Sequence, residues 1–178
     1  MKMRGGFVSN SSSSSFILFL EKKPATSEDM KLLLFGDKEY FYHPYYEPEP
    51  KVYSVMTEKY PTLQVAETVY NDLKNQEPMT LEQLCDELSC GWVYHDLDDG
   101  SKRPAFDSFR KGDSLDTDWE TYQKVLEEYH MKLAKQLINK SKGKEIYFVE
   151  YSDDTTYGCA LEQGSLFEKI EAVTVSKH

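Results

Sequence analysis

Five consecutive apolar residues, Phe16 to Leu20, form the feature that most constrains how this chain can fold. A short continuous apolar run, ended by Glu21-Lys22-Lys23-Pro24, predicts a buried strand in the middle of a sheet. The run is far shorter than the roughly 20 apolar residues that a membrane-spanning helix requires. No apolar segment typical of a signal peptide precedes it. We therefore expect a soluble, cytoplasmic protein with a central strand and no contact with a membrane.

A long amphipathic helix is the second strong pattern. Thr117-Asp118-Trp119-Glu120 has the sequence of a capping box, and a lysine-rich stretch followed by Gly143 is typical of a helix C-terminus. Between these two signals, apolar residues recur at steps of three and four: Trp119, Tyr122, Leu126, Tyr129, Leu133 and Leu137. We expect the longest helix of the chain near residues 117–140.

The remaining predicted elements are shorter. Helices are expected from Thr26 or Ser27 to Leu34, from Pro61 onward, and after the capping box that begins at Thr80. The apolar face of the second of these helices would be formed by Leu63, Ala66, Val69, Tyr70 and Leu73. Strands are expected at the edge of a sheet within residues 39–53, and at residues 51–57, 92–94, 145–151 and 169–176.

These elements together predict one α+β domain over residues 1–178. Its sheet should be mostly antiparallel and should be accompanied by about four helices. Residues 1–15 are expected to form a serine-rich N-terminal arm, because the run Ser11 to Ser15 is the only low-complexity segment.

Cysteine usage is typical of a reducing compartment. The chain has three cysteines, Cys85, Cys90 and Cys159, with no CxxC pair and no histidine beside them. A structural metal site needs four converging ligands, and the four histidines lie far apart in the sequence. We expect buried free thiols and neither a metal ion nor an organic cofactor.

The sequence contains no GxSxG, HExxH or GxGxxG motif. A metal-assisted nuclease would require two carboxylates and a lysine converging from neighbouring strands. Lys144, Glu145 and Glu150 share one predicted strand, but alternation places Glu145 on the side opposite the other two. A non-enzymatic role is therefore favoured. The alternative hypothesis is a metal-assisted hydrolase or nuclease of unknown substrate, and the adjacent His95 and Asp96 also leave an acid–base hydrolase open.

The N-terminal string is unusual. Gly6-Phe7-Val8-Ser9-Asn10 is followed by five serines and Phe16. It resembles the N-terminal signature of a family of uncharacterised small proteins from bacteria, phages and other mobile elements, in which a near-identical GFVSNSSSSSF opens the chain. The resemblance implies an origin and no particular chemistry. The serines themselves have three interpretations: an arm that packs flat and continues into the central strand, a nest of donors for an anion, or a modification site.

Charge is distributed very unevenly along the chain. Residues 67–128 contain six bases and sixteen acids, which accounts for the whole net charge of −10, whereas both flanking segments are neutral. A dense group of carboxylates precedes and opens the long helix: Asp96, Asp98, Asp99, Asp107, Asp113, Asp116, Asp118 and Glu120. Aromatic residues are interleaved with them, namely Trp92, Tyr94, Phe106, Phe109 and Trp119.

Three interpretations of this acidic segment compete. It can be a solvated face that also stabilises the helix N-terminus. It can be a calcium loop, although the glycine of Asp96-Leu97-Asp98-Asp99-Gly100 is one place early and Asp107 occupies the position of the bidentate Glu. It can also be a surface that imitates the phosphate array of nucleic acid and anchors through its aromatic residues.

The resulting hypothesis is an acidic, non-enzymatic interaction protein of phage or mobile-element type. Its partner would be a host protein with a basic nucleic-acid-binding groove, part of a nucleic-acid-handling or defence complex that it blocks, as some anti-CRISPR proteins do. The residues expected to bind the partner are the eight carboxylates above together with Trp92 and Tyr94. With no basic run longer than two residues, direct binding to DNA or RNA is not expected. A structural domain without such a partner is a further alternative.

Overall fold

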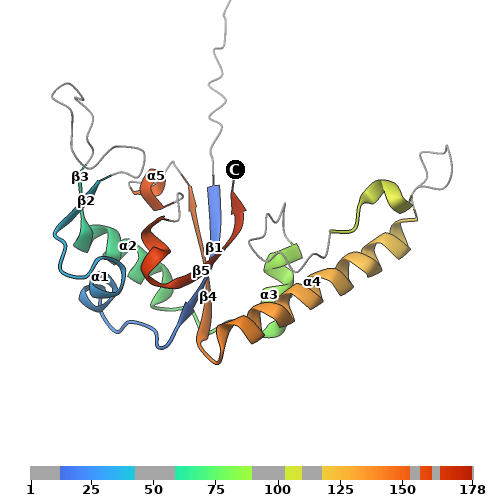
Figure 1. The fold of residues 1–178 in the computed structure, drawn as a ribbon, viewed down its shortest axis with the longest axis horizontal. Helices are drawn as coiled ribbons and strands as arrows, with labels where there is room; N and C mark the ends of the chain where they lie inside the picture. Colours follow the sequence, from blue (N-terminus) through green and yellow to red (C-terminus); the bar gives the residue numbers. More distant parts are fainter. Residues whose placement is uncertain are drawn as a thin grey trace, which may run out of the picture.

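A computed structural model describes residues 13–42, 59–89, 103–109, 118–152, 157–161 and 165–177. The chain is a single α+β domain with antiparallel sheets, as predicted (Figure 1). The elements follow in the order β1 (Ser13–Leu20), α1 (Ser27–Phe35), β2 (Tyr40–Tyr42), β3 (Lys59–Pro61), α2 (Thr62–Leu73), α3 (Leu81–Ser89), the 3-10 helix η1 (Phe106–Phe109), α4 (Trp119–Ser141), β4 (Glu145–Ser152), α5 (Gly158–Leu161), the 3-10 helix η2 (Ser165–Lys169) and β5 (Glu171–Lys177). The predicted strand at residues 92–94 lies outside the described residues.

The apolar run forms the centre of the main sheet, which confirms the first prediction. The strand order is β4-β1-β5, and both neighbours pair with β1 in antiparallel orientation. Residues 16–20 are at most 2 % exposed, because strand pairing satisfies their backbone groups while their side chains enter the core on both faces. Ser13, Ser14 and Ser15 already belong to β1, where Ser14 and Ser15 are buried, in line with the interpretation that the serine arm packs flat and continues into the central strand.

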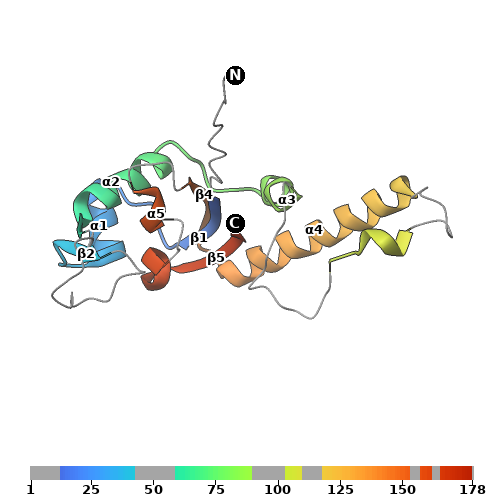
Figure 2. The ribbon, with the colours of Figure 1, turned by 90° about the horizontal axis from the view of Figure 1, so that it is seen from above.

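Helices cover both faces of this sheet, and the domain therefore has three layers (Figures 1 and 2). On one face, Phe16, Leu18 and Leu20 pack with Tyr147 and with residues of α1, α2, α5 and η2. On the other face, Ile17 and Phe19 pack with residues of α3 and α4. The alternation of side chains along one strand thus supplies both hydrophobic cores.

Local capping residues position the shorter helices. Thr26 and Asp29 form a reciprocal capping box at the start of α1, and Thr80 and Gln83 exchange the equivalent hydrogen bonds at the start of α3. One predicted detail of α2 was wrong. Leu63 is 41 % exposed and Val65 is fully buried, because the face that α2 turns toward the sheet is rotated from the predicted one.

The aromatic and proline-rich segment begins with a small separate sheet. β2 pairs with β3 in antiparallel orientation, and Phe41 stacks between Phe35 and Tyr60. The strand expected at residues 51–57 falls outside the described residues. None of the described helices combines the length and apolarity needed to cross a lipid bilayer.

Candidate partner-binding surface

Helix α4 is divided into a buried half and a projecting half. Its fully buried residues all lie in the second half: His130, Leu133, Ala134, Leu137 and Ser141. The first half extends away from the sheet and is accompanied by η1 (Figure 2). The sequence predicted one continuous apolar face, but Trp119 is 57 % exposed. Trp119 is exposed because the three-layer body ends before the helix does.

Four aromatic rings gather at the projecting end. Phe106 lies 5.1 Å from Trp119 and 5.5 Å from Tyr122, and Phe109 lies 5.4 Å from Tyr122, measured between ring centroids. The Asp118 amide donates a hydrogen bond of 3.0 Å to the Phe109 carbonyl oxygen, which ties η1 to the start of the helix. We call Phe106, Phe109, Trp119 and Tyr122 the aromatic cluster. Ring contacts of this kind stabilise a small unit that the main core does not reach.

The acidic residues of α4 also lie at this end. Glu120, Glu127 and Glu128 belong to its first half together with one base, Lys124, whereas Lys132, Lys135 and Lys140 belong to its second half. This arrangement favours the helix, since carboxylates stabilise its N-terminus and ammonium groups its C-terminus. At the projecting end itself, two carboxylates, Asp118 and Glu120, flank the exposed Trp119 in the sequence, whereas Glu127 lies near Cys85 of α3.

The structure describes three of the predicted carboxylates. Asp107 is exposed in η1, and Glu120 is exposed in the first turn of α4. Asp118 is the N-cap of α4, and its carboxylate accepts a hydrogen bond of 3.1 Å from the Thr121 amide. The helix starts one residue later than the predicted capping box, so Asp118 has a structural role. The other predicted residues lie outside the described ones: Trp92, Tyr94, Asp96, Asp98, Asp99, Asp113 and Asp116.

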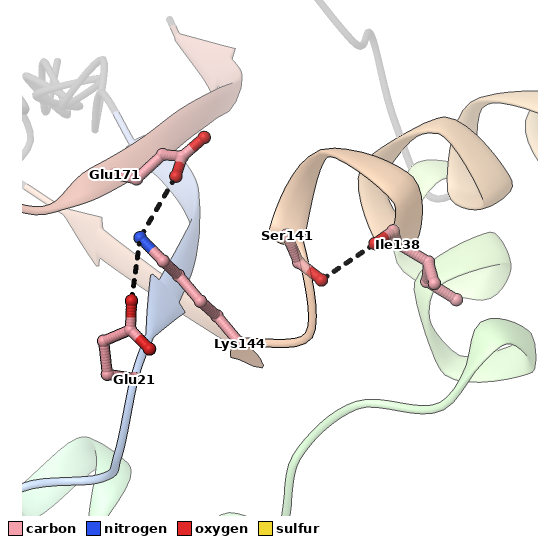
Figure 3. Close-up of polar contacts among 5 residues, drawn as sticks. All are labelled: Glu21, Ile138, Ser141, Lys144 and Glu171. Atoms are coloured by element: carbon pink, nitrogen blue, oxygen red, sulfur yellow. Dashed lines mark hydrogen bonds and ion pairs between the residues drawn. The ribbon is translucent and has the colours of Figure 1, made fainter.

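Two of the residues considered for nuclease chemistry, Lys144 and Glu145, make other contacts, and Figure 3 shows those of Lys144. The Lys144 ammonium lies 3.5 Å from Glu21 and 3.3 Å from Glu171, and the hydrogen bond with Glu171 raises the pKa of Lys144. Glu145 accepts hydrogen bonds from the Lys23 amide and the Tyr147 hydroxyl. Within the described ranges, no three His, Cys, Asp or Glu side chains lie close enough together to hold a metal ion.

Cys85 is a free, half-buried thiol on α3. Burial raises the pKa of this thiol, and the nearby Asp86 and Glu127 carboxylates add to the rise. Its thiolate is therefore disfavoured, which is typical of a structural cysteine rather than a nucleophile. Cys90 lies outside the described residues.

A cleft of about 340 Å³ lies between α3 and the outer edge of β4. Its lining residues come from the segment before α3, from α3 itself and from β4: Gln76, Glu77, Met79, Gln83, Glu87 and Phe148. No pattern in the sequence indicates this cleft. Glu77 and Glu87 were counted in the acidic segment, but nothing in the sequence indicates which strand edge they face.

The folded structure disfavours the charged form of the Glu87 carboxyl group. Partial burial raises the pKa of its carboxyl group from the ordinary value of 4.5, and the Glu150 and Asp86 carboxylates raise it further. The folded state therefore binds this proton more tightly than the unfolded state does. The associated stability is fully present below the unfolded-state pKa and is lost as pH rises through the folded-state pKa.

Replacing Glu87 by Gln should therefore stabilise the fold at neutral pH. We expect a gain of less than about 0.5 kcal/mol, because solvent screens a partly exposed group. The gain should disappear in acid, where wild-type Glu87 is itself protonated. Thermal unfolding of both proteins at pH 4 and pH 7 measures this difference. The control is Glu82→Gln on the same helix, which removes a favourable first-turn carboxylate and should not stabilise.

In comparisons with protein-family models, curated proteins and solved structures, nothing matches this chain.

Proposed function

We propose that this chain is an acidic, non-enzymatic interaction protein of phage or mobile-element type. In this proposal it binds and blocks a host nucleic-acid-handling or defence complex by occupying a basic groove, in the manner of an anti-CRISPR inhibitor that imitates nucleic acid. The N-terminal GFVSNSSSSSF string supports the mobile-element origin, and the acidic segment supports a basic partner.

One observation supports the proposal most directly. Trp119 is 57 % exposed although it packs against Phe106, and it lies at a helix end that projects from the body among carboxylates. Exposed tryptophan is unfavourable in water, and Trp is strongly enriched among residues that dominate binding energy at interfaces. Duplex DNA presents negative charge to grooves rich in Lys and Arg. An acidic rim around an aromatic anchor has the charge that such a groove attracts.

The proposal predicts separate effects of the anchor and of the charges. Trp119→Ala should weaken partner binding about tenfold or more, mainly by faster dissociation. A second variant replaces Asp96, Asp98, Asp99, Asp113 and Asp116 by Asn and keeps the Asp118 cap. It should slow association and reduce the salt dependence of binding, while unfolding free energy changes by less than about 0.5 kcal/mol per site.

The measurement is capture of partners from a bacterial lysate by immobilised protein, followed by elution with salt or with duplex DNA. The matched control removes the same amount of charge from exposed acids elsewhere on the surface: Glu28, Asp37, Glu39, Glu67 and Glu82. The expected result is a basic nucleic-acid-binding protein that duplex DNA displaces and that the control variant still captures. Equal capture by the wild type, by Trp119→Ala and by the variant with five Asp→Asn substitutions would contradict the proposal. The carboxylates of the acidic segment would then be a solvated face.

A further inference from the structure

Part of the outer edge of β4 has backbone groups that no described residue pairs with. The Met79 amide donates a hydrogen bond of 2.8 Å to the Ile146 carbonyl oxygen, so the backbone of Ile146 points away from β1. Successive residues of a strand alternate in direction, and the N–H and C=O groups of Phe148 and Glu150 therefore point outward as well. Met79 pairs with Ile146, and no other described residue forms a backbone hydrogen bond with the outward N–H and C=O groups of Phe148 and Glu150.

The cleft runs beside this free stretch of edge. Phe148 and Met79 line it with apolar surface, and Gln76, Gln83, Glu77 and Glu87 add polar groups. Phe148 points to the face of the sheet that α3 and α4 cover. A strand added at this edge would direct alternate side chains into the cleft, since side chains of neighbouring strands on one face lie next to each other.

The charged residues that line the cleft are both acidic, and the nearest described cation, the Lys23 ammonium, is held by the Gln76 carbonyl oxygen at 2.6 Å. Glu77 and Glu87 line the cleft, and Glu150, exposed on β4, lies close enough to Glu87 to act on its titration. The charged groups that act on Glu87 are carboxylates, Glu150 and Asp86. Such an edge repels an acidic segment and leaves a negative potential that a cationic side chain would neutralise.

The β4 edge has a stretch that no described residue pairs with, and the cleft and its lining carboxylates adjoin it. From these observations we infer a second binding site, distinct from the aromatic cluster. We propose that the β4 edge accepts an extended basic segment of a partner protein by strand addition. Phe148 and Glu150 pair with the backbone of the segment. Lys or Arg side chains at alternate positions enter the cleft and meet Glu77, Glu87 and Glu150. Main-chain hydrogen bonds provide the affinity in this mode of recognition, and side chains at alternate positions provide the specificity.

The test uses a synthetic peptide of about six residues, a usual strand length, in which Lys and Val alternate. The control is the same peptide with methyl groups on the backbone nitrogens of alternate residues. It has the same charge, but along one of its edges it has no N–H groups left to pair with a neighbouring strand. Isothermal titration should show binding of the first peptide and at least about tenfold weaker binding of the second. Glu87→Gln should weaken the first peptide several-fold although this variant is expected to fold at least as well as wild type. Glu82→Gln, on the same helix but not in the cleft, should leave the affinity unchanged.

Amide chemical shifts locate the peptide. We expect the changes to be concentrated at Phe148 and Glu150. Equal affinity for the methylated peptide, or shift changes at the aromatic cluster instead of β4, would overturn the inference without deciding the proposed function. A dimer that forms without peptide and perturbs Phe148 would assign the edge to a second copy and would also overturn it.

Discussion

Replacing Leu18 by Ala should lower the free energy of unfolding by about 2–5 kcal/mol, the largest single effect that we expect. Leu18 is fully buried in the central strand, between Phe16 and Leu20 on the same face of the sheet. Truncation loses the free energy gained by transferring the deleted methyl groups from water into the core. It also leaves a cavity, which cannot close because β1 is paired with β4 and β5 on both sides. Urea unfolding followed by circular dichroism measures the change.

The matched control for this substitution is Leu32→Ala. Leu32 is 57 % exposed on α1, and the same truncation there should change the unfolding free energy by less than about 0.5 kcal/mol. If the two variants proved equally stable, the assignment of β1 as the centre of the core would be wrong.

Gly36→Ala should cost about 1–3 kcal/mol through backbone strain. Gly36 ends α1 with φ 64° and ψ −135°, a conformation that essentially only glycine adopts, and its amide donates to the Leu32 carbonyl oxygen. An added Cβ would lie 3.5 Å from the Lys169 ammonium nitrogen, an ordinary contact distance. The cost therefore arises from the dihedral angles and not from collision. Thermal unfolding measures it.

Lys142 allows the reverse test, in which glycine replaces a residue that has a Cβ atom. It follows α4 with φ 51° and ψ 33°, the left-handed conformation that disfavours side chains with a Cβ atom. Lys142→Gly should therefore leave the stability unchanged or raise it by up to about 1 kcal/mol. A loss for Lys142→Gly as large as that for Gly36→Ala would show that the dihedral angles do not control the stability of these helix ends.

Local patterns were sufficient for most of the secondary structure. The apolar run predicted β1. A cap at Thr26 or Ser27 predicted the start of α1, and the capping box at Thr80 predicted the start of α3, since capping depends only on neighbours along the chain. The step of three and four residues predicted α4 to within two residues at each end. It could not predict where the helix leaves the body. An exposed Trp119 and a buried Leu133 satisfy the same periodicity.

The sequence by itself determined the class of fold, the central strand, the helix starts and the concentration of negative charge, because each depends on residues that are close along the chain. Only the tertiary structure decided which groups meet across long separations. It paired Lys144 with Glu21 and Glu171, and it rotated α2 so that Val65 is buried in place of Leu63. It also placed β4 at the edge of the sheet, where Glu87 faces Glu150. Strand order and helix packing depend on the simultaneous burial of all apolar faces, and a local sequence pattern does not contain that information.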